Sequence, residues 1–441
     1  MANKARLAAL TVLERCRRNQ AFSDNLIGSV ADSAGLEGRD RELCSRLSYG
    51  VLQNSMLCDF YIDSYLSGTK KLEPKLRDIL RLSVYQLLFM DRIPDHAAIN
   101  EAVELCKELG LKRASGLANA VLRKISSNKD NLPEIPRDDM AKYLSIKYSH
   151  PISLAQLFID ELGEKEAENL MAADNTKTPI YIQVNTLKSS TDELLDSFKN
   201  SDIECEIHPF IPNCLILSDC GDITKLSEFK EGKFYVQDPA AKSAVLVLAP
   251  KAGDSLLDAC AAPGGKSFAS AIYMENKGSI LSCDVHSNKL HLIDEGAERL
   301  GIDIIETMPM DARMPNEELK GRFDCIIADV PCSGLGVIRK KPDIRYKDVE
   351  ALKSLPEKQL EILLSLADLL KQGGTLLYST CTILKRENQK VIKKFLEKRK
   401  DFSLDTMELN GIDIPENSVG VTLYPHLHNT DGFYICKLRK Q

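Results

Sequence analysis

Two cysteines stand in short motifs that could carry nucleophilic chemistry. Cys332 lies in "ADVPCSGLG" and Cys381 lies in "LLYSTCT", each directly after an apolar run that predicts a buried strand. A cysteine thiolate is a strong nucleophile even though the ordinary pKa of the thiol is about 8.5. Strands that follow one another along a chain are often neighbours in a sheet, so we expect the two thiols to lie close together.

A pair of thiols in this arrangement suits methylation of a pyrimidine ring at C5. C5 is a poor nucleophile until a thiolate adds to C6, after which C5 can accept a methyl group from a sulfonium. A base then removes the C5 proton, and a second group assists release of the thiol. Asp329, within the first motif, is placed to hold N3 of the ring, and a carboxylate there is expected to have a raised pKa. These residues alone leave open which cysteine attacks.

A loop upstream of both motifs indicates a ligand site. The stretch "ACAAPGGKS", residues 259–267, resembles the end of a phosphate-binding P-loop. A P-loop requires glycine where Cys260 stands, and Pro263 removes a backbone N–H donor. The dinucleotide fingerprint GxGxxG is absent as well. The loop therefore favours a ligand without phosphates; a P-loop NTPase is the alternative, which an ATP-binding assay would test.

Carboxylates after successive predicted strands suit the other parts of such a ligand. Asp284 follows Gly264 at about the 20-residue spacing at which an acidic residue accepts hydrogen bonds from ribose hydroxyls. Asp311 follows the next strand, where an adenine would be read. Either carboxylate alone could equally be a turn or cap residue. Together with the glycine loop, they favour S-adenosylmethionine.

An alternation of strands and helices must position these groups. Apolar runs predict strands at 254–259, 279–285, 303–309, 323–330 and 374–380, with helical segments between most of them. This order favours a parallel sheet covered on both faces, which binds ligands at the carboxyl ends of its strands. Ser354 and Glu357 also have capping-box spacing ahead of a helix.

The preceding residues predict two further domains, so the fold is multidomain. Residues 1–128 contain helical periodicity, and a polar linker with two prolines follows. Residues 141–235 predict a small α+β domain, and residues 236–441 hold the alternating core. The apolar positions that carry the helical pattern are Ile99, Val103, Cys106 and Leu109 in one segment and Leu117, Val121, Leu122 and Ile125 in the next.

Composition excludes several classes of protein. Charged residues make up 28% and no apolar run approaches the length of a membrane helix. The first twenty residues do not form a signal peptide, so we expect a cytoplasmic protein. The 13 cysteines include no CxxC and the 7 histidines show no ligand spacing, so we expect neither a disulfide scaffold nor a metal site.

Charge is distributed unevenly along the chain. The net charge is −6, yet the first 130 residues carry more basic than acidic side chains. A basic face there could contact a polyanion, although a solvated helical surface would look the same. Basic residues also follow Cys332, and we expect them to hold phosphates unless the loop is simply solvated. They are Arg339, Lys340, Lys341, Arg345 and Lys347.

Together these motifs resemble the RNA cytosine-C5 methyltransferase family. "DACAAPGGK" is similar to its S-adenosylmethionine loop, "DVPCSGLG" to its proline–cysteine motif, "YSTCT" to its threonine–cysteine motif and "DGFYICKL" to its closing strand. The resemblance implies that Cys381 is the nucleophile, that Cys332 assists product release and that Asp329 contacts N3 of the base. The implied cofactor contacts are Cys260, Ala261, Ala262, Pro263, Gly264, Gly265, Lys266, Asp284, Asp311 and Asp329.

The N-terminal helices narrow the resemblance. "IPDHAAINEAVELCKELG" and "GLANAVLRKI" are similar to the helical RNA-binding domain of the antitermination factor NusB. Fused to this core, that domain resembles bacterial 16S rRNA methyltransferases of the RsmB (Sun or Fmu) type. The expected fold is an all-α NusB-like domain, a small α+β RNA-recognition-like domain and an α/β Rossmann-like class I methyltransferase core. Val330 departs from the alanine more usual there, which puts packing beside the target base in question.

The resemblance implies transfer of a methyl group from S-adenosylmethionine to C5 of a specific cytosine in 16S rRNA. The implied partners are 16S rRNA and the assembling small ribosomal subunit, with no membrane, and we expect a monomer. Two alternatives stay open. One keeps the chemistry but acts on tRNA or 23S rRNA, and the other is a NusB-like RNA-binding or assembly factor.

Overall fold

The computed structural model describes residues 3–19, 23–66, 72–218, 220–415 and 418–441. Its contacts divide the chain into two compact units. The helical unit contains Met1–Thr176 and Ile338–Val349, and the sheet unit contains Lys177–Val337 and Glu350–Gln441. The helices between residues 140 and 173 thus belong with the N-terminal helices, and so does a short segment that follows the first cysteine motif.

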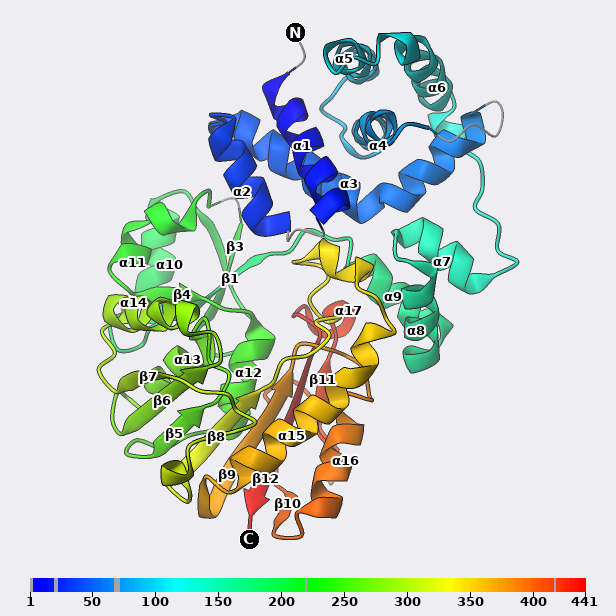
Figure 1. Ribbon diagram of the computed structural model, residues 1–441. Coiled ribbons are helices and arrows are strands. Elements are labelled where there is room, and N and C mark those ends of the chain that lie inside the picture. Colours follow the sequence, from blue (N-terminus) through cyan, green and yellow to red (C-terminus); the bar gives the residue numbers. More distant parts are fainter. Residues whose placement is uncertain (1–2, 20–22, 67–71, 219, 416–417) are drawn as a thin grey trace. The chain divides into compact units, whose positions relative to one another are not determined.

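The helical unit is built from α-helices (Figure 1). In chain order these are α1 (Lys4–Asn19), α2 (Ser23–Ser33), α3 (Gly38–Tyr65), α4 (Pro74–Phe89), α5 (Asp95–Glu108), α6 (Ser115–Ser127), α7 (Met140–Tyr148), α8 (Ile152–Leu162) and α9 (Glu164–Ala173), with the 3-10 turns η1 (Lys112–Ala114), η2 (Lys129–Asn131) and η6 (Pro342–Tyr346).

Most of the apolar positions predicted from helical periodicity are buried in the core of this unit, and a few are not. Along α6, Ala118, Val121, Leu122 and Ile125 are buried, whereas Leu117 is 41% exposed. The buried set has the spacing i, i+3, i+4, i+7 of a single helix face, and Leu117 lies one residue off it. Along α5, Leu105 is likewise buried and Val103 is only half-buried.

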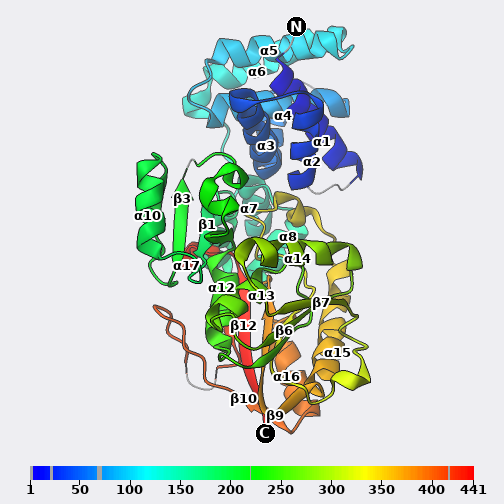
Figure 2. The same ribbon diagram turned by 90° about the vertical axis from the view of Figure 1, so that its left-hand side faces the viewer.

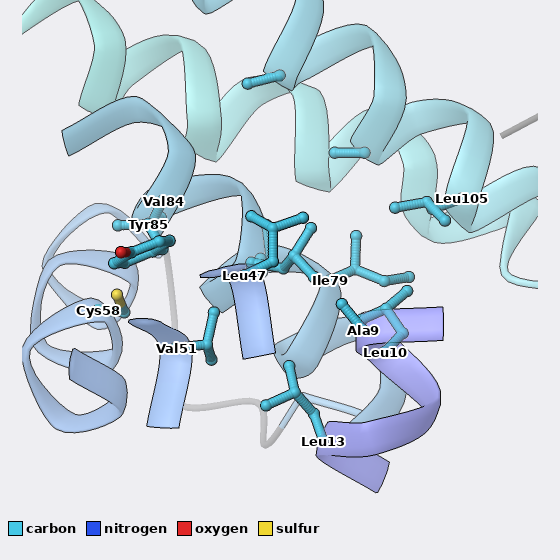
Figure 3. Packing of buried hydrophobic residues seen from close by; sticks show 14 of the residues in the cluster. Ala9, Leu10, Leu13, Leu47, Val51, Cys58, Ile79, Val84, Tyr85 and Leu105 are labelled. Atoms are coloured by element: carbon cyan, nitrogen blue, oxygen red, sulfur yellow. The ribbon is translucent and has the colours of Figure 1, made fainter. Parts of the chain in front are cut away.

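Side chains from several helices meet in this core (Figure 3). Leu47 and Val51 of α3 lie beside Ile79 of α4 and Leu13 of α1. Each fully buried aliphatic side chain contributes roughly 1.5–3 kcal/mol relative to exposure. The N-terminal helices therefore form a hydrophobic core of their own.

The sheet unit begins with a small antiparallel sheet in the order β2-β3-β1-β4. Helix α10 (Thr191–Asn200) packs Leu194 and Phe198 into the same cluster as the sheet residue Phe234. A capping box between Ser190 and Glu193 starts that helix. The strands are β1 (Ile180–Val184), β2 (Glu204–Ile207), β3 (Cys214–Ser218) and β4 (Phe234–Val236), and η3 (Ile223–Lys225) and α11 (Ser227–Lys230) lie between β3 and β4.

The larger sheet has the order β10-β12-β9-β8-β5-β6-β7, with β11 paired to β12. The five predicted strands are β5 (Ser255–Asp258), β6 (Ser279–Asp284), β7 (Ile305–Pro309), β8 (Phe323–Asp329) and β9 (Leu370–Thr380), and all five run parallel. The remaining strands are β10 (Phe402–Leu404), β11 (Val421–Leu423) and β12 (Phe433–Lys440). Strand β12 runs antiparallel along β9 (Figure 2), as the predicted closing strand requires.

Helices cover both faces of this sheet (Figure 1). Neighbouring residues of one strand belong to different cores: Leu256 packs with α12, α13 and α14, and Leu257 packs with α15 and α16. Alternation of this kind is what a parallel sheet buried on both faces requires. The helices are α12 (Pro239–Leu248), α13 (Gly265–Tyr273), α14 (Leu290–Leu300), α15 (Leu355–Ala367), α16 (Gln389–Lys398) and α17 (Pro425–His428), with the turns η4 (Ser287–Lys289), η5 (Glu317–Leu319) and η7 (Ala351–Ser354).

The capping box predicted at Ser354 is wrong. Ser354 has helical dihedral angles, and its side chain donates a hydrogen bond to the Ala351 carbonyl instead of accepting one from the first turn of α15. The 3-10 turn that leads directly into α15 leaves no extended residue at the position of the cap.

Candidate active site

The two predicted cysteines meet above neighbouring strands. Strands β8 and β9 are hydrogen-bonded partners, so the loops that leave their carboxyl ends lie side by side. The Sγ atoms of Cys332 and Cys381 are 3.1 Å apart. The Gly336 amide also donates to the Cys381 carbonyl oxygen at 3.0 Å, which ties one loop to the other. The close approach expected from the order of the strands is confirmed.

The two thiols have opposite electrostatic character. The hydrogen bond from the Cys332 thiol lowers the pKa of Cys381, and the nearby Lys266 ammonium acts in the same direction. The same hydrogen bond, together with burial, raises the pKa of Cys332 well above its ordinary value. Of the two thiols, Cys381 is therefore the one that loses its proton more readily.

The loop after β5 approaches the end of β6 closely. The Ala261 amide donates to the Cys283 carbonyl at 2.7 Å, and the Ala262 amide donates to the Asp284 carboxylate at 3.3 Å. Gly264 has a φ of 106°, and a Cβ atom there would lie 2.6 Å from the Phe268 ring. Glycine is therefore required at this position, and the backbone can lie close to a ligand.

The buried Lys266 and the partly exposed Asp329 form an ion pair beside the thiols. The Lys266 ammonium donates to Asp329 Oδ2 at 2.6 Å, and the Ser379 hydroxyl donates to Asp329 Oδ1 at 2.7 Å. Burial alone would lower the pKa of Lys266, but the Asp329 carboxylate outweighs burial and the pKa lies above its usual value. The ammonium also lies 5.1 Å from the centre of the Phe433 ring. Lys266 is thus a fixed cation within the site.

The two remaining predicted carboxylates lie along the same sheet edge. Asp284, at the end of β6, accepts from the His286 amide at 2.8 Å, and its carboxylate is half-buried. Asp311, after β7, accepts three hydrogen bonds from the amide and guanidinium of Arg313, which lowers its pKa. The Asp284 carboxylate therefore accepts fewer hydrogen bonds than the Asp311 carboxylate. Cys260 is half-buried in the loop, and burial raises its pKa.

Sequence reasoning missed Asp258, a buried carboxylate under the loop. Its Oδ2 accepts from the Ser267 hydroxyl at 2.8 Å, and Ser267 accepts from the Ser282 hydroxyl at 2.8 Å. Burial raises the pKa of Asp258 to about 7. This chain of hydrogen bonds joins the ends of β5 and β6 to the first turn of α13. An acidic residue closing a short apolar strand was the only sequence signal for it.

The predicted phosphate-binding role of Arg345 is wrong. Its side chain is fully buried in the helical unit, where it donates to the carbonyl oxygens of Gln53, Tyr148 and Ser149 and to Asn175 Oδ1 at 3.0–3.3 Å. These oxygens occupy the donors that a phosphate would need. Arg339 is also buried, whereas the side chains of Lys341 and Lys347 are exposed.

We predict that Arg345→Met lowers the free energy of unfolding by about 3 kcal/mol, because several buried carbonyl oxygens lose a charged donor. For a unit of this size, that loss corresponds to a decrease of roughly 6–12 °C in the melting temperature. Thermal unfolding of the full-length protein, followed by circular dichroism, measures the change. Lys341→Met is the matched control and should change stability by less than about 0.5 kcal/mol. Equal melting temperatures for the two variants would contradict the anchoring role.

Two classes of site are not found in the described residues. No group of three or more histidine, cysteine, aspartate or glutamate side chains there is arranged to hold a metal ion. No helix in the same residues is long and apolar enough to cross a membrane.

Three family models match successive parts of the chain. The first is the NusB family over residues 3–127, followed by a ferredoxin-like domain of the RsmF/B-like methyltransferases over residues 150–224. The third is the 16S rRNA methyltransferase RsmB/F model over residues 245–439. The predicted NusB-like domain, α+β middle domain and methyltransferase core are confirmed, and the middle domain is of the ferredoxin-like type.

Curated proteins match nearly the whole chain, and solved structures match two thirds of it or more. The probable ribosomal RNA small subunit methyltransferase B of Bacillus subtilis is 38% identical over 98% of this chain and 98% of its own length. The corresponding protein of Synechocystis is 33% identical over 99% of each. The crystal structure of PH0851 has a TM-score of 0.82 at 28% identity over 99% of this chain and 98% of its own. NSun6 from Pyrococcus horikoshii, solved with SFG, has a TM-score of 0.58 at 25% identity over 66% of this chain and 98% of its own.

Proposed function

Because the chain belongs to the RsmB/F family of 16S rRNA methyltransferases, we propose that it methylates C5 of a cytosine in 16S rRNA through a bond between Cys381 and C6 of the base. The observation that carries this proposal is the 3.1 Å approach of the Cys332 and Cys381 sulfurs at the ends of β8 and β9. A methyltransferase acting on a more nucleophilic atom, such as a ring nitrogen, has no need of two thiols.

S-Adenosylmethionine is the methyl donor, and the residues of the loop after β5 fit it. It supplies an electrophilic methyl group on a sulfonium. The glycine-dependent turn at Gly264 gives the chain a close approach without a phosphate cradle, and Asp284 offers carboxylate oxygens to ribose hydroxyls. We assign the loop residues Cys260 to Lys266 to the wall of this site and Asp311 to the adenine end.

Cys381 performs the covalent step in this proposal. Its thiolate forms the Sγ–C6 bond, which makes C5 nucleophilic enough to accept the methyl group. Loss of the C5 proton to a base then lets the C6–Sγ electron pair return to sulfur. Cys332 assists this release by donating its hydrogen bond to the departing thiolate, as the direction of the two pKa shifts supports.

Asp329 orients the base in this proposal. Its carboxylate is held by Lys266 and Ser379 at the carboxyl end of β8, and a quarter of its side-chain surface is still exposed, at 27%. The exposed part of the carboxylate suits a hydrogen bond accepted from the exocyclic amino group on the N3 edge of a cytosine, and from N3 itself once N3 carries a proton. Lys266 keeps a positive charge near the ring, where negative charge develops on addition of the thiolate.

The helical unit binds the RNA in this proposal. Exposed basic side chains of η1 and α6 provide contacts for the phosphate backbone without reading sequence. They are Lys112, Arg113, Arg123 and Lys124. We take 16S rRNA, free or within an assembling small subunit, as the substrate.

Bisulfite sequencing tests the function directly. A strain that lacks this protein should lose one protected cytosine in 16S rRNA, and a plasmid copy should restore it. The tRNA and 23S rRNA of the same strain are the internal controls. If every protected 16S cytosine stays protected while a tRNA or 23S rRNA cytosine loses its protection, the substrate assignment is wrong. If no protected position changes in any RNA, the proposed methylation is wrong.

A further inference from the structure

The peptide groups on both sides of Cys332 are held by two side chains that the proposed chemistry does not use. Gln359 of α15 donates from Nε2 to the Pro331 carbonyl oxygen at 3.1 Å. Glu387, between Cys381 and α16, accepts from the Ser333 amide at 2.9 Å. The same Gln359 nitrogen also donates to the same Glu387 oxygen at 2.9 Å. The two side chains therefore form one continuous clamp around the cysteine.

The clamp is attached to the loop that carries Cys381. The Ser333 hydroxyl donates to Thr382 Oγ1 at 2.7 Å, and Thr382 directly follows Cys381. The Tyr378 hydroxyl, within β9, donates to the Glu387 carbonyl oxygen at 2.6 Å. Both cysteine loops are thus tied to the same buried carboxylate residue, which fixes their separation.

Burial of this carboxylate is costly and indicates a role beyond packing. Gln359, Glu387 and Ser333 have no exposed surface, and Oε1 of Glu387 has no hydrogen-bond partner among the described residues. A buried charge without a cationic partner is unfavourable, and apolar side chains of similar volume could fill the same space. Apolar side chains could neither accept a hydrogen bond from the Ser333 amide nor place a negative charge near Cys332.

We propose that Glu387 and Gln359 are positioning residues for methyl transfer, which hold the Cys332 thiol against the Cys381 sulfur so that the thiolate can leave the base. This inference rests on the proposed function. Gln359 fixes the peptide group before the cysteine, and Glu387 fixes the one after it. The negative charge of Glu387 also helps Cys332 to keep its proton, since it is one of the causes that raise the pKa of that thiol.

Two variants separate the geometric and electrostatic parts of this role. Gln359→Met keeps the volume but removes both donated hydrogen bonds. Glu387→Gln can still accept both hydrogen bonds through its carbonyl oxygen but has no charge. Glu397→Gln is the control, because Glu397 is an exposed residue of α16. Each full-length variant is assayed for kcat, for both KM values, for the covalent protein–RNA adduct on denaturing gels and for the melting temperature.

Gln359→Met is expected to lower kcat by about 100-fold with both KM values unchanged, because a small misplacement of a reacting group has an effect of this size. The adduct should accumulate, since release fails after the bond to the base has formed. Glu387→Gln should shift the alkaline limb of the pH–kcat profile to lower pH. Removal of the carboxylate lowers the pKa of Cys332, so that thiol loses its proton at a lower pH than in the wild type. Glu397→Gln should match the wild type in every measurement.

Either of two results would overturn the proposal. One is wild-type kcat, adduct level and pH profile in both variants. The other is a loss of kcat that follows a loss of melting temperature without accumulated adduct, which would show a purely structural role. Cys332→Ala on the same RNA is the reference. If it gives no adduct, the proposed function itself fails; if it gives an adduct and Gln359→Met does not, only the positioning role fails.

Discussion

Cys381→Ala should reduce methyl transfer by roughly 10⁴-fold or more, the loss typical of removing a covalent nucleophile. Without the thiolate no bond to C6 forms, and C5 of the cytosine stays unreactive. The hydrogen bond with Cys332 lowers the pKa of Cys381, which supports Cys381 as the attacking thiol in the proposal. The measurement is transfer of a labelled methyl group to 16S rRNA under single-turnover conditions, together with a gel assay for the adduct.

Two comparisons make that result specific. Cys205→Ala changes a half-buried cysteine of β2 outside the site and should retain wild-type activity. The affinity of Cys381→Ala for RNA should be unchanged, because the substitution removes a reacting atom and not a contact surface. Retention of even a tenth of the activity by Cys381→Ala would exclude this residue as the nucleophile.

Cys332→Ala should form the bond to the base but release it slowly, so that a covalent protein–RNA species accumulates. Loss of the thiol removes the hydrogen bond that stabilises the departing sulfur at 3.1 Å. The adduct should contain the transferred methyl group, because failure comes after the methyl step. The expected decrease in turnover is about 10²–10⁴-fold, the range typical of a proton-transfer partner. Denaturing electrophoresis with labelled RNA and labelled methyl donor measures both features.

The conservative variant provides the control. Cys332→Ser keeps a hydroxyl donor at the same position and should accumulate less adduct than Cys332→Ala. The double variant with Cys381→Ala should form none, because no nucleophile remains. Accumulation of adduct by Cys381→Ala instead of Cys332→Ala would reverse the two roles.

The parts of the site that the sequence predicted share one physical reason. Residues that end buried strands are placed by the strand order, and a parallel sheet brings those ends to one edge. Cys332 and Cys381 were predicted to meet on this ground, and the 3.1 Å between their sulfur atoms confirms the prediction. Their separate roles came from the resemblance to a family and stay predictions.

The parts that the sequence did not predict depend on tertiary contacts. Arg345 lies in a basic run and was expected to face phosphates, yet it is buried among carbonyl oxygens from residues about 170 or more positions away in the sequence. Gln359 of α15 and Glu387 in the turn before α16 are ordinary polar residues in the sequence, and only their burial distinguishes them. Neither periodicity nor a local motif predicts hydrogen-bond partners that lie so far apart in the sequence.

Mapping the site of attachment tests the central claim most directly. Wild-type protein is incubated with methyl donor and 16S RNA that contains 5-fluorocytidine, whose C5 fluorine cannot be removed as a proton and therefore traps the adduct. Trypsin and ribonuclease digestion followed by mass spectrometry then distinguishes residues 372–385, which contain Cys381, from residues 323–339, which contain Cys332. We predict a methylated fluorocytidine nucleotide on Cys381. Attachment to Cys332, or no attachment to either peptide, would contradict the assignment of Cys381 as the nucleophile.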